Sequence, residues 1–202
     1  MSRVGKDPFG DMALAAYRDA GVTPRVLQMD DASTGAAFIF VNEDNGDNAI
    51  IVVPGAAGLI GIEDVEANRA DIERAAVFMT QLEQPIEAAM HGLSMARAAG
   101  VTTIFNPAPA QPIPEEIYAL CDYFVPNEVE AADIVGHPVE SDDQARAAAD
   151  QLLARGAKAV ILTLGSRGAL YHTAERIEFV PAFSAGQVID TTGAGDAFLG
   201  GF

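Results

Sequence analysis

The sequence predicts a Rossmann-like α/β fold, an αβα sandwich built on a mostly parallel sheet, with a small second β-sheet projecting from it. One observation is the regular alternation of strand-like and helix-like segments after Pro54-Gly55, which is typical of right-handed βαβ crossovers. Another is a pair of β-prone runs, joined by the turn-rich residues 42–48, that precedes this alternation. With 202 residues, 50% of them hydrophobic, the chain can bury a sizeable core and is expected to form one globular domain.

The segment before the alternation is expected to contain a helix and a hairpin. Apolar residues follow a helical spacing over residues 9–20, and Gly21 supplies a stop. Short β-prone runs follow over residues 25–29, 36–41 and 49–53. The dipeptide Asn45-Gly46 marks a hairpin tip between the last two of these runs. We therefore expect a hairpin that stands apart from the main sheet.

The alternating part supplies the main sheet and its helices. The expected helices cover residues 62–74, 85–99, 114–120, 129–135 and 142–154, and the expected strands cover residues 76–82, 102–105, 123–125 and 159–163. Runs at 169–172, 177–180 and 187–189 are too closely spaced for crossover helices, so an antiparallel edge is expected. Ligands of such folds sit at the carboxyl ends of the strands. The residues directly after strands are Glu83, Asn106, Asn127, 165–168 and 190–196.

The composition limits the partners and the compartment. The formal net charge of −17, without any basic run, argues against a nucleic-acid partner, because such binding depends on clustered Lys and Arg. The single cysteine, Cys121, excludes an intrachain disulfide and a cysteine-based zinc cluster, which fits a reducing compartment. No apolar run approaches the length of a membrane span, and the first residues lack the apolar core of a secretory signal. We expect a soluble, cytoplasmic protein with no membrane partner.

The most informative motif runs from Asp190 to Ala197, between a strand ending and the start of a helix. The free N–H groups of Gly193, Ala194 and Gly195 can converge there on an anion such as a phosphate. Asp196 would not help to hold a phosphate, but it is well placed to take a proton from an attacking hydroxyl. The alternative is a plain turn followed by an acidic residue in the first helical turn. The full motif in this context favours phosphoryl transfer.

The other candidate segments are less specific when taken alone. Asn127 followed by Glu130 is also a helix-capping pattern, the glycines of residues 163–168 also suit a tight turn, and Glu83 alone would pass for a surface residue. Several enzyme classes are excluded. There is no Walker A loop, Phe198 stands where a dinucleotide-binding motif needs its third glycine, and the histidines lack metal-ligand spacing. No Gly-x-Ser-x-Gly elbow of a hydrolase is present either.

The motif from Asp190 to Ala197 resembles the second signature of the ribokinase-type carbohydrate kinases, the PfkB family. Further segments resemble that family in the same order along the chain: 79–83, 105–110, 125–130 and 162–168. The resemblance implies that Asp196 is the base that deprotonates the primary hydroxyl of a sugar, and that Gly193, Ala194 and Gly195 form the anion hole. It also implies that Glu83 hydrogen-bonds the sugar.

The same resemblance assigns the cofactors ATP, Mg²⁺ and a monovalent cation, K⁺. Nucleotide contacts are implied for Asn127, Thr163, Leu164, Gly165, Ser166, Arg167, Gly168 and Gly195. Glu130 is associated with magnesium indirectly, since Mg²⁺ keeps several waters. Asp190 and the carbonyl of Thr192 correspond to positions that hold the monovalent cation; taken alone, Asp190 could also be a turn cap.

The implied function is ATP-dependent phosphorylation of ribose to ribose 5-phosphate. Fructokinase, deoxyribokinase and nucleoside kinase remain open alternatives, as does an inactive remnant that serves as a binding module. By resemblance, the fold is incomplete at both termini, because strands that carry sugar contacts and helices that complete the nucleotide pocket would flank it. Residues 1–23 and 54–202 would form the kinase core, and residues 24–53 a β lid through which a homodimer forms.

Overall fold

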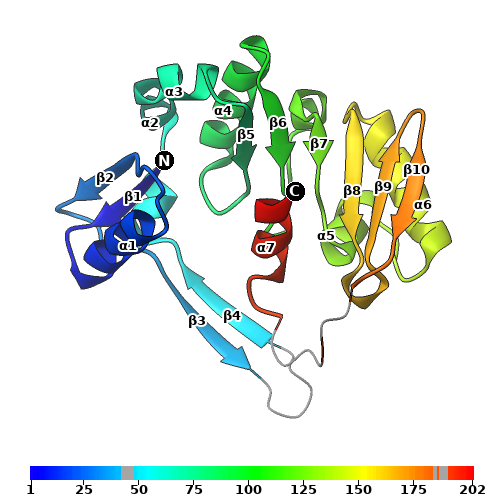
Figure 1. Cartoon of the computed structure of the whole chain (residues 1–202), viewed down its shortest axis with the longest axis horizontal. Coiled ribbons are helices and arrows are strands. Elements are labelled where there is room, and N and C mark those ends of the chain that lie inside the picture. Colours follow the sequence, from blue (N-terminus) through cyan, green and yellow to red (C-terminus); the bar gives the residue numbers. More distant parts are fainter. Residues whose placement is uncertain (42–47, 184–185, 187–190) are drawn as a thin grey trace.

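The computed structural model describes residues 1–41, 48–183, 186 and 191–202 (Figure 1). Its main sheet has six strands in the order β10, β9, β8, β7, β6, β5. The strands are β5 (Val77–Thr80), β6 (Thr102–Phe105), β7 (Tyr123–Phe124), β8 (Ala159–Thr163), β9 (Ala169–Thr173) and β10 (Ile177–Val180). β5 to β8 pair in parallel, whereas β8, β9 and β10 pair antiparallel. The predicted α/β fold with an antiparallel edge is confirmed, and the strand expected over 187–189 lies outside the described residues.

Helices pack on both faces of this sheet. They are α4 (Ile86–Ala98), α5 (Glu128–Val135), α6 (Asp142–Ala154) and α7 (Ala194–Gly201), with the 3₁₀ helices η2 (Glu115–Leu120) and η3 (Gly165–Arg167). Neighbouring residues of one strand point to opposite faces, so Phe105 joins the large core cluster while Ile104 joins a smaller one with Phe198 of α7. No helix in the described part of the chain combines the length and apolar character that a membrane crossing requires.

The large core is centred on three aromatic rings. Phe124 lies 5.7 Å from Phe105 and 5.1 Å from Tyr118, measured between ring centroids, and all three are almost completely buried. Leu93 of α4 and Leu152 of α6 belong to the same cluster. Each fully buried side chain of this size contributes about 1.5–3 kcal/mol through removal of its apolar surface from water. This core fixes the strands whose ends carry the site.

A separate two-stranded sheet forms from β1 (Ser2–Gly5) and β2 (Val26–Met29), which pair in parallel and are connected by α1 (Pro8–Asp19). The sequence did not predict β1, because four residues that include Ser, Arg and Gly have little β-propensity of their own. A cavity of about 540 Å³ lies between this small sheet and the main one, lined by Ser2 on one side and by Val77 and Met79 of β5 on the other.

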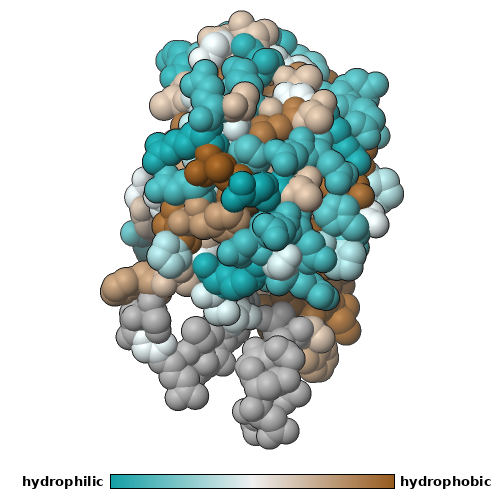
Figure 2. Space-filling model, turned by 90° about the vertical axis from the view of Figure 1, so that its right-hand side faces the viewer, coloured by the Kyte–Doolittle hydropathy of each residue, from teal (hydrophilic) through white to brown (hydrophobic). Residues whose placement is uncertain are grey.

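The predicted hairpin is a two-stranded ribbon, β3 (Ala36–Val41) with β4 (Asn48–Val53), in which Phe38 lies opposite Ile51. The expected tip at Asn45-Gly46 lies outside the described residues. Large apolar side chains of the ribbon are exposed on both faces: Phe38, Ile39, Phe40, Val41, Ile50, Ile51, Val52 and Val53. In contrast, the side of the molecule formed by β10 and α6 is covered mainly by hydrophilic side chains (Figure 2).

The single helix expected over residues 62–74 is wrong: after η1 (Gly55–Leu59), the chain forms α2 (Ile62–Ala67) and α3 (Arg69–Glu73), separated at Asn68. The Asn68 side chain donates to the carbonyl of Asp64 at 2.8 Å, and its φ of −106° departs from helical geometry. A local side-chain bond of this kind competes with the helical backbone pattern.

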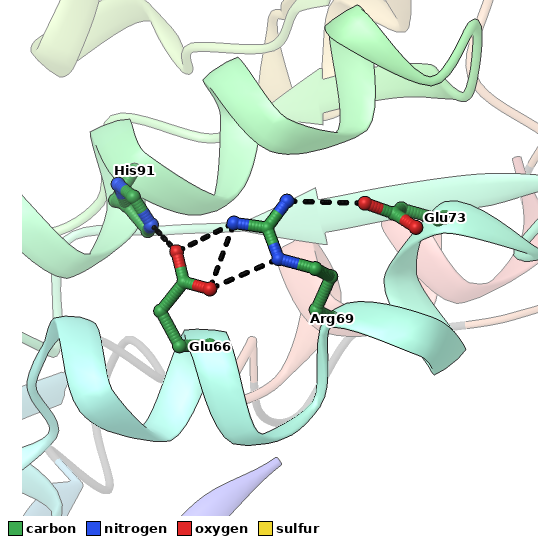
Figure 3. A network of polar contacts seen from close by, with 4 residues as sticks. All are labelled: Glu66, Arg69, Glu73 and His91. Carbon is green, nitrogen blue, oxygen red and sulfur yellow. Dashed lines mark hydrogen bonds and ion pairs between the residues drawn. The ribbon is translucent and has the colours of Figure 1, made fainter.

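A polar network holds the two short helices against each other and against α4 (Figure 3). Arg69 donates to Glu66 at 2.7 Å and to Glu73 at 3.1 Å. His91 of α4 lies 2.6 Å from the same Glu66 carboxylate. The carboxylate of Glu66 in α2 therefore links this helix both to α3, through Arg69, and to α4, through His91.

Candidate active site

The predicted site residues that the structure describes lie at the end of the sheet where the parallel strands finish. Figure 1 shows that α7, drawn in red, begins on the side of the molecule where β8 ends, and that the ribbon of β3 and β4 extends on this same side. An isolated parallel bridge pairs Asn127, which follows β7, with Thr163 at the end of β8. The topology therefore brings two predicted nucleotide contacts, from separate segments, next to each other.

The glycine-rich turn opens α7 as the sequence predicts. Gly193 is the N-cap of this helix and has a φ of +75°, a left-handed conformation that glycine adopts without strain. Asp196 lies in the first turn and is exposed. The N–H of Ala194 donates to the carbonyl of Thr191 at 3.1 Å, so this N–H is turned into the loop. Binding of a phosphate by Ala194 would require that bond to open or to be shared.

The helix that carries Asp196 is anchored on the sheet by its far end. Phe198 and Leu199 pack on a cluster of three residues: Ile104 of β6, Ile161 of β8, and Val125, which directly follows β7. At the next turn, the ring of Phe202 meets the ring of Tyr123 edge-on, with 5.0 Å between centroids. A carboxylate that must meet a substrate with sub-ångström accuracy benefits from such a rigid support.

Asn127 and Glu130 form a capping box at the start of α5. The Asn127 side-chain oxygen accepts from the N–H groups of Val129 and Glu130, at 2.9 and 2.8 Å. In return, the Glu130 carboxylate accepts from the backbone N–H and the side-chain amide of Asn127, both at 2.9 Å. Glu130 is 6% exposed, and burial, reinforced by the negative charge of Glu128, raises its pKa above 4.5 although the Asn127 N–H opposes the shift.

This capping box is chemically compatible with magnesium held through water. The hard oxygen donors of Asn127 and Glu130 suit Mg²⁺, but each of these oxygens already accepts a hydrogen bond from the box itself. The pair can therefore orient waters of a hydrated ion better than it can replace them. Within the described ranges, no group of three or more His, Cys, Asp or Glu side chains could hold a metal ion. Asp190, predicted for the monovalent cation together with the Thr192 carbonyl, lies outside the described residues.

The loop predicted to contact the nucleotide is a tight turn stabilised by its own backbone. The N–H of Leu164 donates to the carbonyl of Gly168 at 2.8 Å, and both Gly165 and Gly168 have positive φ, of +54° and +104°. Leu164 is buried, whereas Gly165, Ser166 and Arg167 are exposed. Arg167 donates to Asp142 at 3.1 Å and to the carbonyl of Val139 at 3.2 Å, which fixes the loop to the start of α6.

Glu83 is set apart from the other predicted residues. It follows β5, the edge strand of the sheet, whereas Asn127 follows β7 and Thr163 is the last residue of β8. Glu83 is exposed and lines the cavity between β5 and β1. Sugar contacts from Glu83 would thus have to come from this cavity side, at the same carboxyl end of the parallel strands as the nucleotide loop but three strands away from β8.

Two residues near the site were missed by the sequence analysis. A Cβ added at Gly165 would lie 3.4 Å from a carboxylate oxygen of Glu128, so this carboxylate borders the nucleotide loop. The position of Glu128 directly after Asn127 was the sequence feature that could have identified it. Asp7 was missed as well, although Asp followed by Pro8 is a typical start of a helix. Its contacts reach the base of the ribbon and are described below.

Comparison with known proteins decides the family. The family model described as pfkB family carbohydrate kinase matches residues 1–202, the whole chain. The chain belongs to the pfkB family of carbohydrate kinases. Among the pfkB family members it resembles are a deoxyribokinase from Salmonella typhi, 37% identical over 204 residues, and a ribokinase from Staphylococcus aureus, 37% identical over 203 residues. Each alignment covers 100% of this chain and 66% of the relative, so the chain spans slightly less than two thirds of their length.

Solved structures give the same result for the pfkB fold. The structure of Arabidopsis thaliana ribokinase complexed with ribose and ATP superposes with a TM-score of 0.86 at 29% identity, covering 98% of this chain and 65% of that one. The predicted family resemblance and the ribokinase-like fold, with a main sheet and a small antiparallel sheet, are therefore confirmed. The roles of the individual site residues stay predictions.

Proposed function

We propose that this chain carries the phosphoryl-transfer site of an ATP-dependent sugar kinase that phosphorylates the primary hydroxyl of ribose. The observation that carries the proposal is the exposed Asp196, held in the first turn of α7 directly behind the left-handed turn at Gly193. This places a proton acceptor beside backbone N–H groups at a helix N-terminus, where negative charge is stabilised. The product would be ribose 5-phosphate.

In the proposed reaction, Asp196 accepts the proton of the primary hydroxyl as its oxygen attacks the γ-phosphorus of ATP. The bond from this phosphorus to the bridging oxygen breaks, and ADP leaves. Gly193, Ala194 and Gly195 would stabilise the charge on the transferred group, each donor contributing on the order of 3 kcal/mol in the transition state. The turn of residues 163–168 would lie against the nucleotide.

Two cations belong to the proposal. Magnesium bound to ATP would neutralise charge on the phosphates, and Asn127 and Glu130 would hold its waters. A monovalent cation, K⁺, would sit beside the anion hole at Asp190 and the Thr192 carbonyl. We expect activity to require Mg²⁺ and to rise when K⁺ replaces a large organic cation in the buffer.

A second sugar is favoured by a specific observation. The deoxyribokinase and the ribokinase are equally similar to this chain, at 37% identity each. Ribose and 2-deoxyribose differ by one hydroxyl, and a site built to hydrogen-bond that hydroxyl discriminates strongly against its absence. Measuring kcat/KM for both sugars therefore decides between the two. Fructose and nucleosides, which the sequence leaves open, belong in the same comparison.

A binding module without catalysis is the alternative from another class. The open cavity between β1 and β5 is the feature that favours it. In that case ATP or a sugar would bind without ADP release. Cys121, a free and fully buried cysteine, supports the proposed cytoplasmic location in either case.

The apolar ribbon supports a homodimer, and residues 24–53 as the segment that forms it. Within this segment β2 pairs with β1, and only β3 and β4 form the ribbon. A two-stranded ribbon with apolar side chains on both faces is marginal in water unless one face is covered. We propose that one face covers the sugar and the other meets a second copy.

The deciding experiment measures ADP release by the full chain with ATP, Mg²⁺, K⁺ and ribose. Asp196→Asn is expected to lower turnover by about 10²–10⁴, the usual contribution of a general base, while binding of a fluorescent ATP analogue is retained. Asp143→Asn is the matched control, because Asp143 also lies exposed in the first turn of a helix. Turnover that survives in Asp196→Asn removes Asp196 as the base, and analogue binding without any wild-type turnover favours the binding module.

A further inference from the structure

The ribbon of β3 and β4 is joined to the body only near its root. Apart from the half-buried Ala36, every described side chain over residues 36–41 and 49–53 is exposed. A ribbon without buried side chains has nothing along its length to fix its direction, so this direction depends on the segments where it leaves the body, residues 33–35 and 54–56. These segments are therefore the place to look for a determinant of the ribbon's position.

The two root segments are packed backbone against backbone. The N–H of Ala56 donates to the carbonyl of Ser33 at 2.8 Å. A Cβ added at Gly35 would lie 2.5 Å from the carbonyl oxygen of Pro54, and one at Gly55 would lie 2.5 Å from that of Ser33. This close approach holds the two strands of the ribbon to each other. It does not fix the ribbon relative to the body.

The carboxylate of Asp7 ties the first root segment, at Thr34, to the body. Its Oδ1 accepts from the N–H of Gly10 at 2.9 Å, which caps α1, and from the hydroxyl of Thr34 at 2.7 Å. Its Oδ2 accepts from the backbone N–H of Thr34 at 2.7 Å. The hydroxyl of Thr34 in turn accepts from the N–H of Gly5, the last residue of β1, at 2.9 Å. One side chain thus joins β1, α1 and the residue two positions before β3.

These contacts exceed what a helix cap requires. Ser141, the N-cap of α6, accepts one hydrogen bond, from the N–H of Gln144 in its own helix. Asp7 also accepts one bond from its own helix, from Gly10. Its two other short hydrogen bonds come from Thr34, 27 positions away in the sequence. The N–H groups of Thr34 and Gly10 lower the pKa of Asp7, so the carboxylate is charged at neutral pH and both of its oxygens accept.

We infer that Asp7 is a positioning residue that sets the direction of the ribbon relative to the body through its paired hydrogen bonds to Thr34. The consequence for catalysis rests on the proposed function, in which the ribbon covers the sugar. A ribbon that swings about its root would close over the sugar less often, which weakens sugar binding more than it slows the chemical step. The inference about direction itself does not depend on catalysis.

The test measures the distance between spin labels on the ribbon and on the body. Ala49→Cys and Glu116→Cys place labels at exposed positions, while the native Cys121 is buried and its pKa is raised by burial to about 12, so it stays unlabelled. Asp7→Ser keeps a residue that caps α1 but cannot reach Thr34 with two oxygens. We expect this variant to broaden the distance distribution and to leave the helical circular dichroism unchanged.

Three further variants separate positioning from stability. Thr34→Val removes the hydroxyl and should also broaden the distribution, whereas Thr34→Ser keeps the hydroxyl and should restore the wild-type width. Ser141→Ala removes a cap that has no contact with the ribbon, and it should lower stability without changing the distance. If Asp7→Ser fails to fold, the comparison of Thr34→Val with Thr34→Ser decides. A wild-type distribution in Thr34→Val, or in a folded Asp7→Ser, overturns the inference.

Kinetics supply a second readout where the chain turns over. Loss of one or two hydrogen bonds at the root should raise the KM for the sugar about two- to tenfold, with a smaller change in kcat. The KM for ATP should not change, because the nucleotide loop at residues 163–168 is held by Asp142 of α6 and by the carbonyl of Val139, away from the ribbon root. An inactive wild-type chain would refute the proposed kinase activity and would leave the distance measurement as the test of the positioning role.

Discussion

Asp122 receives two hydrogen bonds from Thr103, from its backbone N–H at 2.9 Å and from its hydroxyl at 3.2 Å. Thr103 lies in β6, and Asp122 immediately precedes β7, so the pair ties the starts of two neighbouring central strands. The other carboxylate oxygen of Asp122 lies 2.5 Å from Lys158 and 3.6 Å from Arg97. The end of the sheet away from the candidate site is therefore held by one carboxylate.

We predict that Asp122→Asn lowers the free energy of unfolding by about 2 kcal/mol at pH 7, because charge-assisted hydrogen bonds to a partly buried group are lost. Burial alone would raise the pKa of Asp122, but hydrogen bonds from Lys158 and Thr103 outweigh it and lower the pKa below 3.8. A lowered carboxyl pKa stabilises the folded state above pH 3.8, and this stabilisation is lost as the pH falls through the lowered value.

The measurement is urea unfolding of both chains between pH 7 and pH 3. The difference between wild type and Asp122→Asn should shrink towards the acid end. Asp30→Asn is the matched control, since Asp30 pairs with Lys6 at 2.7 Å but is 80% exposed, and it should cost less than about 0.5 kcal/mol. A difference that stays constant down to pH 3 would contradict the assigned role of the charge.

Glu130 should show the opposite pH dependence. Its pKa is raised, mainly by burial, so the folded state favours the protonated carboxyl. The resulting stabilisation of the folded state is present below pH 4.5 and is lost as the pH rises through the raised pKa of Glu130. We predict that the stability of the wild type, relative to Glu130→Gln, falls over this range. Calorimetric melting of both chains from pH 4 to pH 7.5 tests this, and a relative stability that rises with pH refutes it.

The matched control for Glu130 is Gln144, which has the same capping-box position in α6 but is neutral and only half-buried. Gln144→Ala should lower the free energy of unfolding by about 1 kcal/mol at every pH, since only a cap is lost. Glu130→Ala should lower it by a similar or larger amount and, if the proposed magnesium role is right, should also weaken ATP binding only in the presence of Mg²⁺.

Gly168 is predicted to tolerate no side chain. Its φ is +104°, and a Cβ would collide with the carbonyl oxygen of Val180, the last residue of β10. Gly168→Ala should therefore lower the free energy of unfolding by about 2–3 kcal/mol, combining backbone strain with a steric clash. Gly136→Ala isolates the strain, because Gly136 has a φ of +78° with open space around it, and should cost about 1 kcal/mol. Equal costs in thermal melting would remove the clash as a cause.

Local patterns predicted most of the main sheet. β8 was expected over the residues where it forms, because a short buried run rich in β-branched residues lies between a helix and a glycine turn. The antiparallel edge followed from the short spacing before β9 and β10. By contrast, β1 exists because it pairs with β2, and the break at Asn68 depends on a side chain that bonds back to its own helix. Neither β1 nor the break at Asn68 produces a periodic pattern of apolar residues in the sequence.

The candidate site likewise contains features that the local sequence predicts and features that it does not. The turn at Gly193 and the exposed Asp196 were predictable, since a glycine before a helix and an acid in its first turn are local features. The engagement of the Ala194 N–H by Thr191 was not, because it depends on the conformation of the loop. The bond between Asp7 and Thr34 joins residues 27 positions apart, a distance over which no local pattern carries information.

The last prediction concerns the ribbon as a contact between two copies. Alternation along the strands places Phe38 and Ile51 on one face and Ile39 and Ile50 on the other. We predict that the wild type sediments as a dimer at micromolar concentration. Because each chain carries a net charge of −17, repulsion opposes association, and raising the salt concentration should strengthen the dimer.

Two single substitutions identify the face that forms the contact. Phe38→Lys and Ile39→Lys each place a cation on one face, at positions that are 60% and 44% exposed in the single chain, so neither should change its stability by more than about 0.5 kcal/mol. A lysine also reduces the repulsion between copies, so dissociation in one variant must come from burying a charge in the contact. Dissociation in only one variant assigns the dimer to that face and leaves the other face for the sugar. A monomeric wild type at high salt would exclude the dimer for this chain.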